Sequence, residues 1–227
     1  MLNETGSLAD PTLRSSMTDH TAARGGNWQI RRCRAADDGP MRSQIVAWQR
    51  SDVPGMEWCR LTLEGAASSL AGAVVLTWDG APWRIDYAIE LDSAGRTRLL
   101  TIGADGLADG APVRVDIRLE ADGRGRWRRD GASVIDDPDA LDCDLGFSPS
   151  TNTLPIRRLG LEIGQKREIA VAWILFPSFE VVHGRQSYER LTERAWRYRS
   201  AGFEADLTVD DDGLVADYYV WRAVARS

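Results

Sequence analysis

The sequence predicts an all-β, mainly antiparallel fold with one short helical segment near residues 151–160. Two segments, 83–91 and 112–120, alternate apolar and polar side chains, which is the period of a strand with one buried face. Turn signals recur at short intervals, and Asp-Gly pairs suit the positive φ of tight hairpins; these pairs are Asp79-Gly80, Asp122-Gly123 and Asp212-Gly213. Short connections between many strands imply an antiparallel order.

The strands are expected in a nearly unbroken series. Residues 185–199 fit both a helical and an extended spacing, and we favour two strands there because Trp196 and Tyr198 alternate. The other strands are expected at 43–49, 57–64, 71–78, 83–91, 96–102, 112–120, 167–176, 202–209 and 214–224.

One short helix is expected within "STNTLPIRRLGL" at residues 150–161. Asn152 or Thr153 can cap its first turn, Pro155 is tolerated there, and Gly160 can end it. The segment would form a lid or plug on the sheet.

The domain organisation follows from composition. No shift in composition divides the 227 residues, so we expect a disordered polar leader at 1–26 and a single domain at 27–227. Met17 is a candidate for the true start, because the residues before it offer nothing to pack. The leader lacks the apolar core of a secretory signal, and no segment has the ~20 apolar residues of a membrane span. We therefore expect a cytoplasmic protein that does not insert into membranes.

Charge and cysteine content exclude several partners. The net charge of −6 argues against nucleic acid as the natural partner. Cys33, Cys59 and Cys143 are widely separated and show no C-x-x-C spacing, so neither disulfides nor a zinc site is expected. We expect no cofactor and no metal, and the oligomeric state stays open.

Three motifs in the second half of the chain are together specific. They read "DCDLGFSPSTNTLPIRRLGL" at 142–161, "PSFEVVHGRQSYERL" at 177–191 and "FEADLTVDDDGLVADY" at 203–218. On these motifs the chain resembles a family of uncharacterised bacterial proteins named for putative glycolipid binding. The resemblance implies a spiral β-roll, in which a long antiparallel sheet curls around an apolar interior. It also implies a lipid-like ligand, and it assigns no catalytic residues.

The sequence departs from that family's pattern at two places. Gly95 stands where the family usually has a tryptophan. Near the C-terminus, the usual Tyr-Pro-Gly is replaced by Tyr218, Tyr219 and Val220. If these positions shape a pocket, ligand preference differs in this chain.

Two adjacent arginines, Arg157 and Arg158, lie in an apolar stretch. A guanidinium keeps its charge, so a buried one needs an acidic or hydrogen-bonding partner. Asp142 and Asp144 are candidate internal partners, and we favour internal pairing over ligand binding. Of the two arginines, we expect Arg158 to pair internally and Arg157 to be the one available to an anionic group of a ligand.

Polar and aromatic side chains complete the candidate site. Asn152 and Thr153 could bind sugar hydroxyls, and aromatic faces stack on sugar rings. Most of the nine tryptophans are expected to fill the core, with one or two at a ligand site. The candidate ligand-binding residues are Arg157, Arg158, Asn152, Thr153, Trp83, Tyr87, Tyr188 and Gln186.

The expected function is binding of an amphiphilic, lipid-like or glycolipid molecule in an apolar interior, without chemistry. His183 is the only histidine after the leader and no G-x-S-x-G element occurs, so we expect no catalytic residues of the Ser-His-Asp type. Two alternatives stay open. One is a hydrolase of a glycosidic or ester bond that uses paired carboxylates. The other is a partner-binding module with a packed core and an exposed apolar patch.

Overall fold

The computed structural model describes residues 41–64, 67–108 and 110–227, so the predicted leader and the start of the predicted domain lie outside the described residues. Fifteen strands form one sheet. They are β1 (Arg42–Arg50), β2 (Gly55–Glu64), β3 (Ala67–Trp78), β4 (Ala81–Leu91), β5 (Thr97–Ala108), β6 (Ala111–Ala121), β7 (Arg126–Arg129), β8 (Ala132–Asp136), β9 (Ala140–Leu145), β10 (Lys166–Ile174), β11 (Val181–Arg190), β12 (Ala195–Ser200), β13 (Phe203–Val209), β14 (Val215–Tyr218) and β15 (Trp221–Arg226).

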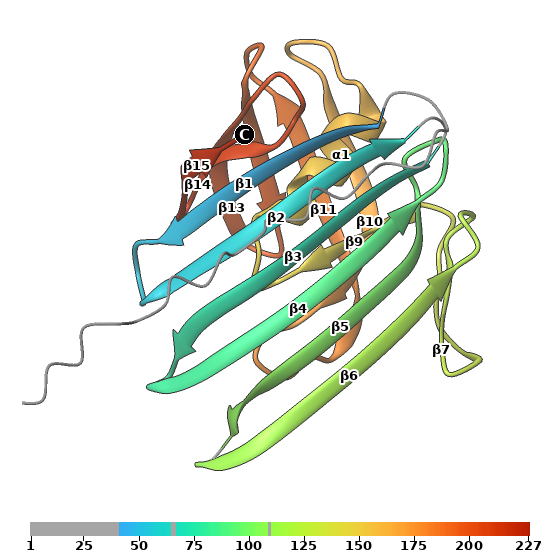
Figure 1. Ribbon diagram of the computed structural model, residues 1–227. Coiled ribbons are helices and arrows are strands. Elements are labelled where there is room, and N and C mark those ends of the chain that lie inside the picture. The colour runs from blue at the N-terminus through green and yellow to red at the C-terminus, as the bar shows by residue number, and fades with distance from the viewer. Residues whose placement is uncertain (1–40, 65–66, 109) are drawn as a thin grey trace, which may run out of the picture. The chain divides into compact units, whose positions relative to one another are not determined.

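The strand order shows how the sheet curls. It runs β8-β7-β6-β5-β4-β3-β2-β1-β15-β14-β13-β12-β11-β10-β9, so the first and last strands of the chain pair in its middle. Every pairing is antiparallel except that of β9 with β10. The two edges return onto the sheet, because β9 contacts β5 and β8 contacts β11. Figure 1 shows β1–β6 side by side, with β9–β13 behind them. The predicted all-β curled sheet is confirmed.

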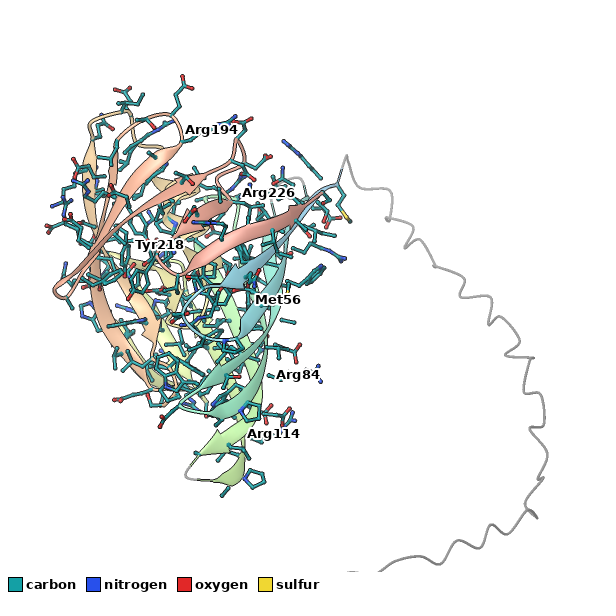
Figure 2. The ribbon with its side chains drawn as sticks, turned by 90° about the vertical axis from the view of Figure 1, so that its left-hand side faces the viewer. Met56, Arg84, Arg114, Arg194, Tyr218 and Arg226 are labelled. Atoms are coloured by element: carbon teal, nitrogen blue, oxygen red, sulfur yellow. The ribbon has the colours of Figure 1, made fainter. Side chains whose placement is uncertain are left out.

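Alternating side chains position the core on the inner face. Along β4 and β6, residues such as Ile85 and Ile117 are buried, whereas Arg84 and Arg114 on the same two strands are exposed. Figure 2 shows both arginines on the outer side of the sheet. Burial of the apolar face of so many strands is the main stabilising contribution to this fold.

Three short strands were not predicted, and one predicted strand is divided. β7 and β8 form an arginine-containing hairpin, and β9 holds Asp142 and Asp144 among its six residues. The prediction of one strand at 214–224 was wrong, because a turn separates β14 from β15. Tyr219 takes a φ of 51° in that turn. The tight turn has no glycine to mark it in the sequence.

The predicted helical segment is confirmed. It consists of a 3₁₀ turn, η1 (Ser150–Asn152), followed by α1 (Thr153–Leu159). Gly160 ends the helix in the left-handed region, with φ 55°. Ser150 contacts β4 through Tyr87, and Asn152 contacts β11 through Tyr188. The segment therefore plugs the space between two distant parts of the sheet.

Other predictions concern the thiols and the membrane. Cys59 and Cys143 are buried free thiols, and Cys33 lies outside the described residues. Across residues 41–64, 67–108 and 110–227, no helix is long and apolar enough to cross a membrane.

A cluster of aromatic rings packs around Trp83 on β4. Trp83 packs with its ring centroid 5.5 Å from that of Phe176 and 5.6 Å from that of Phe179. Gly106 on β5 makes room for this indole, because a Cβ there would lie 2.3 Å from two atoms of the ring. The close approach of the ring requires glycine at this position.

Gly106→Ala is expected to destabilise the protein by about 1–3 kcal/mol, because the indole is wedged between aromatic rings and cannot withdraw. Denaturant unfolding measures the change. Gly103→Ala on the same strand is the matched control, since its Cβ would approach no atom closer than 3.8 Å. Equal losses in the two variants would contradict the steric explanation.

Candidate ligand-binding site

A pocket of about 280 Å³ opens between the strand ends on both sides of the β1–β15 pair. It lies near the surface and not deep in the sheet, because its rim includes Tyr219, which is 68% exposed. A cluster of buried apolar side chains packs on the inner face of the sheet. Aromatic side chains from five parts of the chain line this pocket: Trp78, Trp173, Tyr198, Phe203, Tyr218, Tyr219 and Trp221.

The aromatic walls hold one another in place. The ring of Tyr198 lies 5.9 Å from that of Tyr218 and 6.1 Å from that of Phe203, and Phe203 meets Tyr219 at 5.1 Å. These separations are typical of edge-to-face and tilted aromatic pairs. The turns β12–β13 and β14–β15 are thereby joined by side-chain packing, which gives the pocket a defined wall.

An arginine forms part of the rim. The Arg50 guanidinium lies 5.2 Å from the centre of the Trp221 ring and 5.8 Å from that of Trp78. Its Nε and Nη2 donate to the two carboxylate oxygens of Asp52, at 2.9 and 2.5 Å. The pKa of Asp52 is lowered, chiefly by this hydrogen bond. The charge of Arg50 is therefore compensated by its own neighbour.

Asp144 at the end of β9 provides the acidic floor. Its carboxylate accepts hydrogen bonds from Gln186 Nε2 and, at 3.1 Å, from Thr151 Oγ1. Protein surrounds the carboxylate except toward the pocket, and this desolvation raises its pKa. Within the described ranges no arginine, lysine or histidine forms an ion pair with it. Asp144 thus faces the pocket without a cation.

A second acidic group lies behind the pocket. Glu57 is 1% exposed, and one of its carboxylate oxygens accepts hydrogen bonds from Tyr87 Oη and Ser148 Oγ. Its other oxygen, Oε2, is buried and has no partner in the described part of the chain. Burial raises the pKa of Glu57 to about 8, so the folded protein holds it as a neutral acid at pH 7. Ser148, and not Glu57, lines the pocket.

The third buried carboxylate in this region belongs to an ion pair. Asp142 is fully buried, and Arg158 donates to it from Nη2 at 2.6 Å and from Nε at 3.1 and 3.2 Å. The desolvation raises the pKa of Asp142, and Arg158 opposes that shift. The pair attaches α1 to β9, and it occupies the Nε and Nη2 atoms of Arg158 with an internal partner.

Arg157 lies in a different place. It borders a separate surface groove of about 520 Å³ with Arg190, Arg194 and the loop 210–213. Its guanidinium donates to the backbone carbonyl of Asp212. Arg194 is paired with Asp211, so this groove carries balanced charge.

The eight predicted site residues are divided among several places. Asn152 lines the pocket, Gln186 holds Asp144, and Tyr188 donates to Asn152 Oδ1 at 2.9 Å. Tyr87 belongs to the Glu57 cluster, and Trp83 packs against Phe176, which also contacts the pocket residue Trp78. Thr153 is buried on α1. The structure thus brings together three of the eight residues around Asp144.

Sequence reasoning did not select the residues that form most of the pocket. Tyr198, Tyr218, Tyr219, Phe203 and Trp173 were not among the candidates, and Asp144 was considered only as a partner for an arginine. A signal did exist. Tyr218, Tyr219 and Val220, at which the sequence departs from the family pattern, line this pocket.

In the described residues, no group of three His, Cys, Asp or Glu side chains is placed to hold a metal ion. The polar groups around the pocket are one carboxylate, one guanidinium, an amide and hydroxyls, and they lie beside the aromatic rings. Such a set can bind an organic headgroup by hydrogen bonds and stacking.

Comparisons with known proteins agree with the resemblance in the motifs. A family profile described as "Putative glycolipid-binding" matches residues 45–222. A crystal structure of a DUF1089 family protein from Pseudomonas aeruginosa is 34% identical, with a TM-score of 0.63, over 75% of this chain and 91% of that one. A β-barrel-like DUF1849 domain from Brucella abortus is 9% identical, with a TM-score of 0.43, over 82% and 96%. No protein with a curated description matches.

Proposed function

Since the chain belongs to the putative glycolipid-binding family, we propose that it binds an amphiphilic, lipid-like or glycolipid molecule at the pocket of Asp144, without chemistry. The observation that carries the proposal is the combination of aromatic walls with a polar floor in one pocket. The headgroup meets Asp144, Asn152 and Ser148, and the apolar part lies against the rings.

The size of the pocket limits what it holds. A volume of about 280 Å³ is at the small end of ligand pockets, and it accommodates a headgroup and the first part of a chain. The remainder of the chain would leave along Phe203 and Tyr219, which are 37% and 68% exposed. Exposed aromatic side chains at the mouth suit contact with an alkyl chain.

Within the Asp144 pocket, the arrangement of the carboxylic acids favours ligand binding over hydrolysis. A paired-carboxylate hydrolase needs two acids that face one cleft about 5–9.5 Å apart. Of Glu57, Asp142 and Asp144, Asp144 alone lines this pocket. Asp142 is held by Arg158, and Glu57 lies behind Ser148.

Tyr218→Ala is expected to weaken binding of a decyl glucoside at least about tenfold, or about 1.4 kcal/mol, because it removes a ring from the wall. Titration calorimetry below the micelle concentration measures the affinity. Trp58→Ala is the matched control, since Trp58 is 41% exposed on β2 and does not line the pocket. Unchanged affinity in Tyr218→Ala, or no binding of any alkyl ligand to the wild type, would contradict the proposal.

A partner-binding role has one observation in its favour. Met56 on β2 and its cross-strand neighbour Val75 on β3 are 52% and 60% exposed, beside Trp58. Figure 2 shows Met56 on the outer side of the sheet. Exposed apolar patches of this kind mark interaction surfaces. If alkyl ligands fail to bind, this outer face becomes the better candidate.

A further inference from the structure

We infer that the headgroup bound in this pocket carries a positive charge, as an ammonium group that lies beside Asp144 and against the rings of Tyr198 and Tyr218. The inference rests on the proposed function and adds the charge of the ligand. It depends on two observations. The other charged groups around the pocket already have a counter-ion, and aromatic rings line the pocket around Asp144.

The charge balance leaves one group without a counter-ion. Arg50 is paired with Asp52, and Asp142 with Arg158. Asp144 receives hydrogen bonds only from the neutral Gln186 and Thr151 among the described residues. A carboxylate withdrawn from water is costly unless a cation accompanies it. Since Asp144 is accessible from the pocket, a ligand can supply that cation.

The walls are of the kind that bind organic cations. The faces of tryptophan and tyrosine attract an ammonium group within about 6 Å, and quaternary ammonium groups are recognised by cages of such rings. Burial raises the pKa of Tyr198 and of Tyr218, and the negative charge of Asp144 adds to both shifts. Asp144, Tyr198 and Tyr218 all line the same pocket of about 280 Å³, so one cation can contact the acid and the rings together.

A positively charged headgroup makes binding depend on pH, because Asp144 must lose its proton to attract it. The desolvation that raises the pKa of Asp144 makes this loss occur at higher pH than in an exposed aspartate. The other titratable and charged groups that face Asp144 or line its pocket are Asp142 and Cys143 on β9, Tyr188 on β11, Tyr198 on β12, Tyr218 on β14, Tyr219 in the turn after β14, Arg158 on α1, and Arg50 on β1.

Tyr198 and Tyr218 stay neutral through the acid range, and Asp142 is held by Arg158, which leaves Asp144 as the group whose ionisation creates the attraction. Affinity for a cationic ligand should rise as the pH is raised from about 4 toward 7. Affinity for a neutral ligand with the same chain should stay nearly flat.

Two sources share this chemistry, an amino sugar and a quaternary ammonium headgroup. The experiment compares four ligands with the same decyl chain by titration calorimetry with the full-length protein: decyl glucoside, decyl glucosaminide, decyltrimethylammonium and decyl sulfate. We expect the glucosaminide or the trimethylammonium ligand to bind at least tenfold more tightly than the glucoside, and the sulfate to bind most weakly. Whichever cation binds better identifies the source.

The outcomes separate the two proposals. Equal or tighter binding of the glucoside overturns the inference and leaves the proposed function intact. Failure of all four ligands to bind overturns both.

Asp144→Asn tests the role of the carboxylate, because asparagine can still accept a hydrogen bond from Gln186. It should abolish the preference for the cation over the glucoside and the pH dependence of that preference, because no negative charge is left to attract the ammonium group. Asp217→Asn makes the same charge change on β14 at a residue that does not line the pocket, and it should leave the preference unchanged. If Asp144→Asn does not fold, the pH dependence of the wild-type protein decides, and a flat profile for the cation overturns the inference.

Discussion

Arg158→Ala is expected to lower the free energy of unfolding by about 3–5 kcal/mol, because it leaves the carboxylate of Asp142 buried without its counter-ion. Asp142 is 0% exposed, and the side chain of Arg158 is 13% exposed. Arg158 supplies the only ion pair that Asp142 makes in the described residues, and it also attaches α1 to β9. Chemical denaturation monitored by tryptophan fluorescence measures the loss.

Arg157→Ala is the matched control for this prediction. It removes the same side chain from the adjacent helix position, but Arg157 is exposed and bonds a backbone carbonyl, so a loss of less than about 1 kcal/mol is expected. The double variant Asp142→Asn, Arg158→Ala should recover part of the stability, since the buried charge is then absent. Similar losses in Arg157→Ala and Arg158→Ala would show that the pair does not hold the helix.

Glu57→Gln is expected to abolish a loss of stability that the wild-type protein undergoes between about pH 5 and pH 8. The pKa of Glu57 rises from an ordinary value of 4.5 to about 8 in the fold because of desolvation. Between these values the folded protein keeps the proton and the unfolded chain releases it. Stability from this group is therefore complete below pH 4.5, and it falls by up to about 1.4 kcal/mol per pH unit until the pH passes 8.

The glutamine variant keeps the oxygen that accepts from Tyr87 and Ser148, so its unfolding free energy should be much less dependent on pH in this window. Denaturation curves at pH 5, 6, 7 and 8 test the prediction. Glu120→Gln on β6 is the control, because that side chain is 60% exposed and should leave the wild-type slope in place. A wild-type stability that stays constant from pH 5 to 8 would contradict the assignment.

The strands could be predicted because their signal is local. The alternation in β4 and β6 and the Asp-Gly turns are read within ten residues of sequence, and they correctly indicate an antiparallel sheet. The turn at Tyr219 was missed because a tyrosine rarely adopts positive φ. β9 was missed because its pattern includes two aspartates, whose burial depends on partners far along the chain.

The pocket could not be predicted in the same way. Trp78 and Tyr218 lie on its rim although their residue numbers differ by 140, and only the curl of the sheet brings them together. Asn152, Gln186 and Tyr188 were selected from a motif, and they lie around Asp144 because η1 packs against β11. The ligand roles proposed for Arg157 and Trp83 stay predictions, since neither residue lines this pocket.

The pairing of β1 with β15 relates the order of the strands in the sheet to their order in the sequence. Ser227 donates its backbone N–H to Ile45, so the end of the chain lies beside the first strand. If β15 were linked directly to β1 and the chain were opened between β8 and β9, every strand would follow its sheet neighbour in sequence. In the described residues, the first and last strands instead pair with each other in the middle of the sheet. Contacts of such long sequence separation are slow to form, so the pairing of β1 with β15 should be the slowest step of folding.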